Sequence, residues 1–437
     1  MIARLKDSLH QNSLQINQYL GLPMEEQGWE VGRAQRQKVI PLPSETKVIK
    51  VFEQVDVAGR LLILGEPGSG KTTTLLRLAE DLIGRAQKSD KAPVPVIFEL
   101  FTWKYNQQTI ERWLIAQLKD KYNIAEKISK QWLKNHQLLP LLDGLDDLGI
   151  LRQRLCVEAI NQFLQQDLER RLVVCCRWQE YQEGEKKLSQ FYGAYSLQPP
   201  HQSEIRDYLQ RLSKYKLWDV IQTNSQMREL AQKPLFLNIM MVAYQGQAIT
   251  NEDQLFEAYI TERLQLPLEL KKYPQGVPFK NEETIEWLTY LAKLLEAQSI
   301  TEFPIEDIQL YWWYIGGERL VYWLSRVLIF RISGPLVFGV IYGLREALIF
   351  GIIFGLIYGL IIEITYRLIF GLRTEIKAQR IITDLVLRLI LSKRGIIPWK
   401  YFRFLQYAHD RKLIQKVGNN YRFIHDALRQ HFARRDI

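Results

Sequence analysis

The sequence contains little cysteine, and the cysteines that it has form no recognisable pattern. Cys156, Cys175 and Cys176 are the three in a chain of 437 residues. An odd number without metal-ligand spacing matches neither a disulfide framework nor a zinc site. We interpret them as small apolar core residues of a protein in a reducing compartment, which argues against a disulfide-stabilised secreted domain.

The sequence also lacks a recognisable leader and any concentrated block of basic charge. Residues 1–20 are polar and interrupted by charges, unlike a secretory signal peptide. The 58 basic and 48 acidic residues give a net charge of +10, but Lys and Arg are spread along the chain. Charge alone therefore leaves both nucleic acid and anionic lipid open as partners.

One stretch carries the strongest signal, because an apolar run, a glycine-rich turn and an amphipathic segment follow one another in residues 61–76. Gly65, Gly70, Lys71 and Thr72 fill every fixed position of the phosphate-binding loop. Backbone N–H groups of such a loop point at phosphate oxygens, and the helix that follows adds its positive N-terminus. We predict that Lys71 reaches the β- and γ-phosphates and that Thr72 ligates Mg²⁺. The predicted nucleotide contacts are Gly65, Glu66, Pro67, Gly68, Ser69, Gly70, Lys71, Thr72 and Thr73.

A second motif, residues 138–147, is an apolar strand that ends in acids. A carboxylate at the C-terminal end of a parallel strand faces the phosphate crevice. We expect Asp143 to hold Mg²⁺, directly or through water, and Asp146 and Asp147 to polarise an attacking water. The alternative is a solvated acidic turn.

Residues 171–176 predict a further buried strand, and Arg177 follows it. An arginine at this edge can sense the γ-phosphate, although a solvated arginine after a strand is also common. Helices are expected between the strands, so the pattern predicts an α/β domain with a mostly parallel sheet. After residue 200 the apolar residues recur at helical spacing alone.

Five segments together resemble a known family. Residues 65–72, 141–147, 174–177 and 230–237 are similar to the NACHT domain, the nucleotide switch of the STAND class of signalling ATPases. Residues 421–433 resemble the end of the winged-helix domain that accompanies it. The resemblance implies an α/β P-loop NTPase domain followed by helical and winged-helix domains.

The resemblance also assigns roles to two distant residues. It implies that Pro234 packs on the adenine, and that His425 contacts the ADP β-phosphate and holds a closed state. Without the resemblance, His425 between Ile424 and Asp426 would be read as an ordinary structural histidine. The family usually has glutamate at the position of Asp147. The carboxylate of the aspartate would lie about one methylene short, which affects ATP hydrolysis rather than nucleotide binding.

Residues 319–373 differ abruptly in composition and interrupt the winged-helix region. Segments 320–344 and 347–372 are long enough for two membrane-spanning helices joined at Arg345 and Glu346. Small residues at every fourth position would let the two helices approach closely in lipid; they are Gly339, Gly343, Ala347, Gly351, Gly355 and Gly359. Basic residues gather at both outer ends, as the positive-inside rule requires; they are Arg319, Arg326, Arg331, Arg367, Arg373, Lys377 and Arg380. A buried helical hairpin in a soluble protein is the alternative.

The expected organisation has six parts. They are an N-terminal helical segment and linker at 1–44, a NACHT domain at 45–200, a helical domain at 201–270, the first part of a winged helix at 271–318, the apolar hairpin at 319–373, and the last part of the winged helix at 374–437.

We therefore expect a membrane-attached switch whose NTPase domain is cytoplasmic. It binds ATP or ADP with Mg²⁺, hydrolyses ATP slowly and changes its homo-oligomeric state with the nucleotide. The resemblance implies bacterial signal transduction, including antiviral defence, although no leucine-rich, WD40 or TPR-like repeat follows the winged helix. The alternatives are an ATP-driven, nucleic-acid-associated AAA-like ATPase, a non-hydrolysing membrane scaffold, and a cytoplasmic location without membrane attachment.

Overall fold

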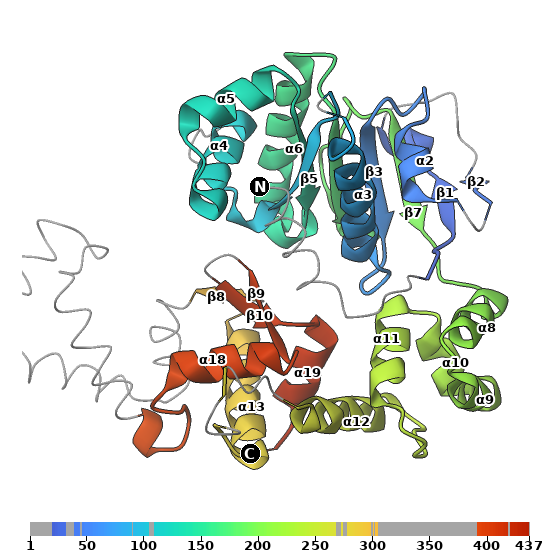
Figure 1. Cartoon of the computed structure of the whole chain (residues 1–437), viewed down its shortest axis with the longest axis vertical. Helices are drawn as coiled ribbons and strands as arrows, with labels where there is room; N and C mark the ends of the chain where they lie inside the picture. Colours follow the sequence, from blue (N-terminus) through green and yellow to red (C-terminus); the bar gives the residue numbers. More distant parts are fainter. Residues whose placement is uncertain are drawn as a thin grey trace, which may run out of the picture. The chain divides into compact units, whose positions relative to one another are not determined.

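The computed structural model divides into two compact units, Met1–Tyr259 and Ile260–Ile437. The residues described are 20–31, 39–43, 46–89, 91–104, 109–267, 272–273, 278–298, 300, 302–304, 391–417 and 420–436 (Figure 1). The predicted apolar hairpin at 319–373 lies outside them.

The first unit is built on a seven-stranded sheet with the order β2-β1-β7-β3-β6-β5-β4. The five strands from β7 to β4 are parallel, and β1 and β2 pair antiparallel at one edge. The predicted mostly parallel α/β sheet is thereby confirmed. The strands are β1 (Met24–Glu26), β2 (Ile40–Pro41), β3 (Arg60–Gly65), β4 (Val94–Glu99), β5 (Leu138–Asp143), β6 (Leu172–Arg177) and β7 (Gly193–Leu197).

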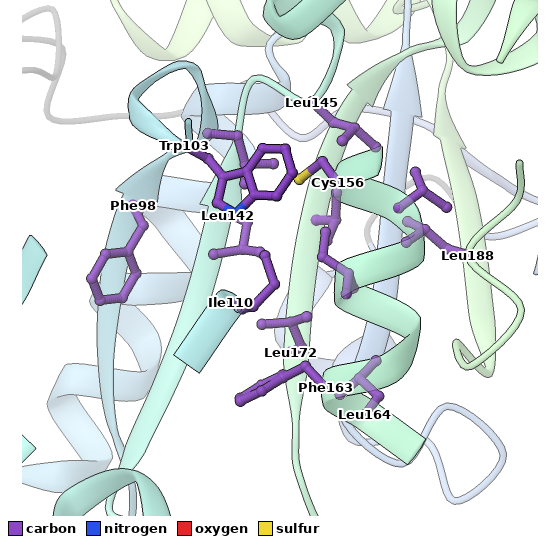
Figure 2. Close-up of a cluster of buried hydrophobic side chains, with 14 of the residues drawn as sticks. Phe98, Trp103, Ile110, Leu142, Leu145, Cys156, Phe163, Leu164, Leu172 and Leu188 are labelled. Atoms are coloured by element: carbon purple, nitrogen blue, oxygen red, sulfur yellow. The ribbon is translucent and has the colours of Figure 1, made fainter. Parts of the chain in front are cut away.

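Helices cover both faces of this sheet, which explains why its central strands are apolar throughout. Successive residues of a strand point to opposite faces. Leu62 and Leu64 enter the core beneath α4 and α6, whereas Leu61 and Ile63 enter the core beneath α2 and α3. The helices of this part are α2 (Val48–Phe52), α3 (Lys71–Ala86), α4 (Ile110–Tyr122), α5 (Glu126–Lys134), α6 (Gly149–Gln165) and α7 (Trp178–Glu183). Figure 2 shows the first of these two cores, in which Trp103 and Leu142 lie beside Cys156 of α6.

The strand order creates a crevice at the carboxyl end of β3. From β3 the chain crosses to β4 at the far edge, and from β6 it crosses back over β3 to β7. Connections that leave two neighbouring strands in opposite directions open a crevice between them, where α/β proteins bind ligands. The crevice between β3 and β6 is therefore the place where the phosphate-binding loop should function.

Residues 1–19, the first part of the expected helical segment and linker, lie outside the described residues, and the described part that follows contains two short strands. Met24–Glu26 forms strand β1 against β7, and Ile40–Pro41 forms the edge strand β2. Strand β7 has a free edge that β1 satisfies through backbone hydrogen bonds, and this pairing leaves no trace in the apolar spacing of the sequence. Pro41 is tolerated because an edge strand does not need every N–H group.

Arg60 opens strand β3 at the end of the sheet opposite the crevice, and it is fully buried. Its guanidinium donates to five backbone carbonyls and lies 5.0 Å from the centre of the Tyr192 ring. The five acceptors are the carbonyls of Leu164, Asp167, Leu168, Arg170 and Gln190. The carbonyl of Leu164 lies in the last turn of α6, where it has no partner within the helix. Arg60 supplies a donor there and ties the chain that follows α6 to β3.

Helices alone follow the sheet in the rest of the first unit, as the spacing predicted. They are α8 (Gln202–Arg211), α9 (Tyr215–Thr223), α10 (Ser225–Ala231), α11 (Pro234–Ala243) and α12 (Glu252–Gln265), which continues into the second unit. Local capping sets the boundaries. Asn224 accepts the N–H groups of Gln226 and Met227 and starts α10. Pro234 occupies the first turn of α11, where its missing N–H costs nothing.

The second unit combines helices with a small antiparallel sheet of the order β8-β10-β9. Its described elements are α13 (Asn281–Ala297), β8 (Glu302–Pro304), α18 (Tyr401–Asp410), β9 (Ile414–Val417), β10 (Asn420–Phe423) and α19 (Asp426–Arg434). Helix α13 packs on α19, and an aromatic cluster around Phe279, Trp287 and Phe404 joins α13 to α18. Within the described part of the chain, no helix has the length and apolar character needed to cross a membrane.

Candidate functional site

The phosphate-binding loop connects the end of β3 to the start of α3, as predicted. Gly70 is the residue before α3 and has φ +92°, in the left-handed region. A methyl group on Gly70 would also lie 2.9 Å from Leu22 Cδ1. A methyl group on Gly65 would lie 2.5 Å from Ser69 Oγ. Both positions therefore require glycine, for the backbone conformation at Gly70 and for the close approach at Gly65.

Lys71 folds back over this loop. Its Nζ donates to the carbonyl oxygens of Gly65, at 2.8 Å, and Glu66, at 2.9 Å. Across the described residues, no carboxylate forms an ion pair with it. Ser69 Oγ is buried and has no hydrogen-bond partner there either. A charged amine and an unpartnered hydroxyl beside a glycine turn form a donor set that suits phosphate oxygens.

Thr72 and Asp143 meet at the base of the crevice. The Thr72 hydroxyl donates to Asp143 Oδ2 at 2.8 Å, which joins the first turn of α3 to the end of β5. The sequence separates these residues widely, and the sheet brings them together. Hydroxyl and carboxylate oxygens are the ligand types that Mg²⁺ prefers. The two predicted metal ligands are therefore adjacent, as one metal ion would require.

Asp146 and Arg177, predicted as separate catalytic residues, bind each other. The backbone N–H of Arg177 donates to Asp146 Oδ1 at 3.0 Å, and Arg177 Nε lies 2.8 Å from Asp146 Oδ2. Glu180 accepts from the other side of the guanidinium at 3.2 Å. Burial lowers the pKa of Arg177, but the charges of Asp146, Asp147 and Glu180 outweigh it, and the net shift is upward. The guanidinium is thus held between two carboxylates at the end of β6.

Asp147 has a different environment from its neighbour. The side chain of Asp146 is 7% exposed, whereas Asp147 is an exposed residue. The N–H of Asp147 donates to the carbonyl of Gly144 at 3.2 Å, closing a turn directly after β5. The two adjacent acids therefore differ in exposure and in direct contact with Arg177, although the charges of both raise its pKa.

Glu99 is a polar residue at the same edge that the sequence reasoning did not single out. It ends strand β4 and lies in register with Asp143 of β5. Lys121 of α4 forms an ion pair with it. Burial, together with the charge of Glu99, raises the pKa of Tyr122 to about 12. Its position as the last residue of a parallel strand was the signal that could have identified it.

The start of α11 packs on the phosphate-binding loop. The N–H of Leu235 donates to the carbonyl of Gly68 at 3.2 Å. A methyl group on Gly70 would lie 3.9 Å from Pro234 Cβ. Pro234 and the loop, both predicted nucleotide contacts, are thus neighbours within the first unit. Leu22, which precedes β1, also contacts this loop, and no sequence pattern marked it.

His425 lies in the second unit and is described within that unit. It precedes α19 and is half-buried, with its Nε2 atom shielded from solvent. Its Nε2 has no hydrogen-bond partner in the part of the chain that the structure describes. Burial, helped by the positive charges of Arg422 and Arg263, lowers the pKa of His425 to about 3. The imidazole is therefore neutral at physiological pH and has an unused polar atom.

Comparison with known proteins identifies one domain. A model of the NACHT domain matches residues 60–215. A comparison with curated proteins found no match.

Three solved structures show a distant likeness. Orc1 of Aeropyrum pernix in complex with DNA has 11% identity and a TM-score of 0.36, with 94% of this chain and 97% of that chain covered. Cdc6p from Pyrobaculum aerophilum has 11% identity and a TM-score of 0.31, with 94% and 98% covered. The Walker-type ATPase Paby2304 of Pyrococcus abyssi has 10% identity and a TM-score of 0.32, with 88% and 93% covered. TM-scores this low support no conclusion about what this chain binds.

Proposed function

Starting from a chain whose residues 60–215 form a NACHT domain, a P-loop nucleotide-binding domain, we propose that this protein is a switch that binds ATP or ADP with Mg²⁺ and hydrolyses ATP slowly. The observation that carries the proposal is the 2.8 Å contact of the Thr72 hydroxyl with Asp143 Oδ2. This contact supports a metal-ligand pair beside Lys71, the cationic residue of the loop.

The residues present fit a nucleoside triphosphate with its metal ion. Lys71 exchanges its two carbonyl contacts for the terminal phosphates, and the loop N–H groups and Ser69 Oγ donate to the remaining oxygens. Thr72 and Asp143 would hold Mg²⁺, which would neutralise phosphate charge. Pro234 and Leu22, which flank Gly70, supply apolar surface at the end of the loop where α3 begins.

Slow hydrolysis follows from the division of roles between the two acids. Asp146 is committed to Arg177 by two contacts, at 3.0 and 2.8 Å. Asp147 is the exposed member of the pair, so it is the carboxylate that orients an attacking water. A single, short carboxylate supports a low rate, which suits a switch that must remain in one nucleotide state.

The second unit supplies the other half of the switch in this proposal. The half-buried His425 has a buried Nε2 without a partner among the described residues, and the positive charges of Arg422 and Arg263 act on the imidazole. This environment favours an anion such as the β-phosphate of ADP. A histidine that contacts one nucleotide state biases a closed conformation, and release of that contact permits self-association.

Membrane attachment and signalling complete the proposal. The apolar segments 320–344 and 347–372, bounded by basic residues, support insertion through a helical pair. The family resemblance supports a role in bacterial signal transduction and antiviral defence, with the NTPase domain on the cytoplasmic side.

The test uses the contact that carries the proposal. ATP binding to the full chain is titrated with and without Mg²⁺, for the wild type and for Asp143→Asn. The wild type should bind about tenfold more tightly with Mg²⁺, and the variant should lose this difference while it retains metal-free binding. Asp120→Asn, at an exposed position of α4, is the matched control and should bind ATP more tightly with Mg²⁺, as the wild type does. Equal Mg²⁺ dependence in Asp143→Asn would contradict the assigned site.

A second measurement separates the alternatives. Phosphate release is followed with and without DNA or RNA at two salt concentrations. Slow release that nucleic acid does not change supports the switch. Strong, salt-sensitive stimulation would favour a nucleic-acid motor, and no release with intact binding would favour a scaffold.

A further inference from the structure

The second unit exposes a compact set of basic and aromatic side chains around the start of α18. No acid occurs between residues 391 and 406. Two of the four aromatic rings in this stretch are exposed, Trp399 by 51% and Phe402 by 49%, whereas Tyr401 and Phe404 are buried. We call the set the 393–403 patch, and its members are Lys393, Arg394, Trp399, Lys400, Phe402 and Arg403, all exposed.

The backbone that carries the patch is firmly held. The turn before α18 has Gly395 at φ +75°, with the N–H of Gly395 bonded to Ser392 O at 3.1 Å and that of Ile396 bonded to Leu391 O at 3.0 Å. This pair of bonds is the Schellman arrangement that ends a helix. Trp287 Nε1 of α13 donates to Gly395 O at 2.9 Å and fixes the turn to the unit. The exposed side chains therefore project from an ordered surface.

Two basic residues of the patch lie at the N-terminus of α18, where positive charge is electrostatically unfavourable. Lys400 precedes α18 and Arg403 lies in its first turn, which contains no acid. The N-terminus of a helix carries partial positive charge and favours acids. Helices α13 and α19 of the same unit follow that preference, with Glu282 and Asp426 in their first turns. A basic first turn costs some helix stability, which indicates that the charges serve a purpose other than folding.

Exposed tryptophan and phenylalanine among basic residues match the chemistry of a lipid interface. Aromatic rings enter the boundary between headgroups and acyl chains, and Lys and Arg bind anionic headgroups. The same chain carries the long apolar stretch that ends at Leu372, shortly before the patch. A nucleic-acid groove uses basic and aromatic residues too, but it would give no reason for that apolar neighbour in the sequence.

We propose that the 393–403 patch is an interfacial docking surface for a membrane that contains anionic phospholipid. Its basic side chains bind the headgroup phosphates and carboxylates, while Trp399 and Phe402 insert among the upper acyl-chain segments. This surface adds to any insertion of residues 319–373, and it does not depend on the nucleotide proposal.

Insertion of residues 319–373 and binding of the 393–403 patch should differ in their dependence on lipid charge. Insertion of an apolar helix pair occurs in neutral phosphatidylcholine vesicles as well as in charged ones. Binding through basic side chains needs anionic lipid, weakens with salt, and changes by about fivefold for each basic residue near the surface. The measured quantity is therefore the gain in binding on adding phosphatidylserine.

The first experiment places a reporter beside the patch. The full chain with Gln406→Cys, one helical turn after Phe402, is labelled with an environment-sensitive dye. The three native cysteines are buried and do not compete. Asp219→Cys gives the matched reporter, because it lies one turn after exposed Tyr215, which Lys214 and Lys216 flank on α9. Phosphatidylserine vesicles should shift the Gln406→Cys dye to the blue and leave the Asp219→Cys dye unchanged.

The second experiment removes the charges. Lys400→Glu with Arg403→Glu should reduce the phosphatidylserine-dependent gain by at least about 25-fold, because two basic residues are lost and the new acids also repel the anionic headgroups. Lys214→Glu with Lys216→Glu, which makes the same change in net charge, should leave it intact. Trp399→Ala should weaken the gain and lessen the blue shift, because the ring no longer anchors the surface.

Three outcomes would overturn the proposal. One is vesicle binding that phosphatidylserine does not strengthen. Another is an equal loss of binding in the two charge-reversal variants. The third is a dye shift at position 406 that a DNA or RNA oligonucleotide produces and phosphatidylserine vesicles do not, which would assign the patch to nucleic acid. Inorganic phosphate should produce no shift, because it offers no apolar phase for the rings.

Discussion

Arg60 and Arg177 lie at opposite ends of the same pair of parallel strands. Arg60 opens β3, opposite Leu172, and Arg177 closes β6, opposite Gly65. Arg60 is completely buried and donates to five backbone carbonyls. The side chain of Arg177 is 36% exposed and is held by carboxylates, with Nε 2.8 Å from Asp146 Oδ2.

The contrast shows that one end of the sheet stabilises the fold, whereas the other end carries the groups that can bind a ligand. At the end where β3 begins, a cation donates to five backbone carbonyls at once, so it cannot move without giving up these hydrogen bonds. At the carboxyl end, Arg177 binds side chains, which can adopt other rotamers when a phosphate competes. The strand order places the crevice at that second end, so the polar groups there can exchange partners.

The largest change in stability should come from the end of the sheet where β3 begins. Arg60→Met should lower the free energy of unfolding of the first unit by about 4 kcal/mol, because five hydrogen bonds from one buried guanidinium are lost at once. Denaturant unfolding measures this change. Arg171→Met, an exposed neighbour, should change stability by less than about 0.5 kcal/mol. Equal stability in both variants would remove the basis of the comparison.

At the carboxyl end of the strands, a substitution should weaken nucleotide binding more than it destabilises the fold. Lys71→Ala should weaken ATP binding by about 100-fold, since a charge-assisted contact with phosphate disappears. Thermal unfolding without nucleotide should be nearly unchanged, because Lys71 donates to two carbonyls in a solvent-accessible loop. Lys88→Ala, beyond the other end of α3, is the control for loss of one positive charge. ATP affinity at the wild-type level in Lys71→Ala would refute the assignment.

His425, whose Nε2 is buried without a partner among the described residues, should make stability depend on pH, unlike Arg60. The pKa of His425 is about 3 when folded and about 6.5 when unfolded. Between these values the unfolded chain binds a proton that the folded chain excludes. Acidification therefore destabilises the second unit by about 2 kcal/mol between pH 7.5 and pH 5. Burial lowers the pKa of His409 too, so its effect has the same sign.

Hydrogen exchange at α13 and α19 can follow this pH dependence. His425→Leu should remove the larger part of it and leave the part that His409 contributes. His201→Gln, at an exposed position of the first unit, should not alter the pH profile. If the pH profile of His425→Leu matched that of the wild type, the pKa of His425 would not be lowered in the folded protein.

The smallest effect should distinguish the two neighbouring acids. Asp147→Asn should slow hydrolysis about tenfold with little change in ATP affinity, because it removes the carboxylate that orients water. Asp146→Asn should slow hydrolysis less and should lower stability by about 1 kcal/mol, since the charged partner of Arg177 is lost. If both variants slowed hydrolysis equally at unchanged stability, Asp146 would share the role of Asp147.

Contiguous motifs made the sheet and the loop predictable. The run from Leu61 to Thr72 contains a strand, a turn and a helix start in one piece, so its spacing specifies the local backbone. The apolar strands were predictable for a related reason. Both faces of the parallel sheet are buried, and a doubly buried strand needs an unbroken apolar run.

The sequence by itself therefore determined the phosphate-binding loop, the acidic end of β5, the parallel α/β sheet and the helical region after it. Tertiary structure alone decided that Leu22 and Leu235 contact the loop, that Arg60 binds five carbonyls, and that Asp146 binds Arg177. The physical reason is that each of these contacts joins residues far apart in the chain. Composition and spacing record which positions are buried or turned, but a polar or apolar side chain does not encode which distant partner the fold will bring to it.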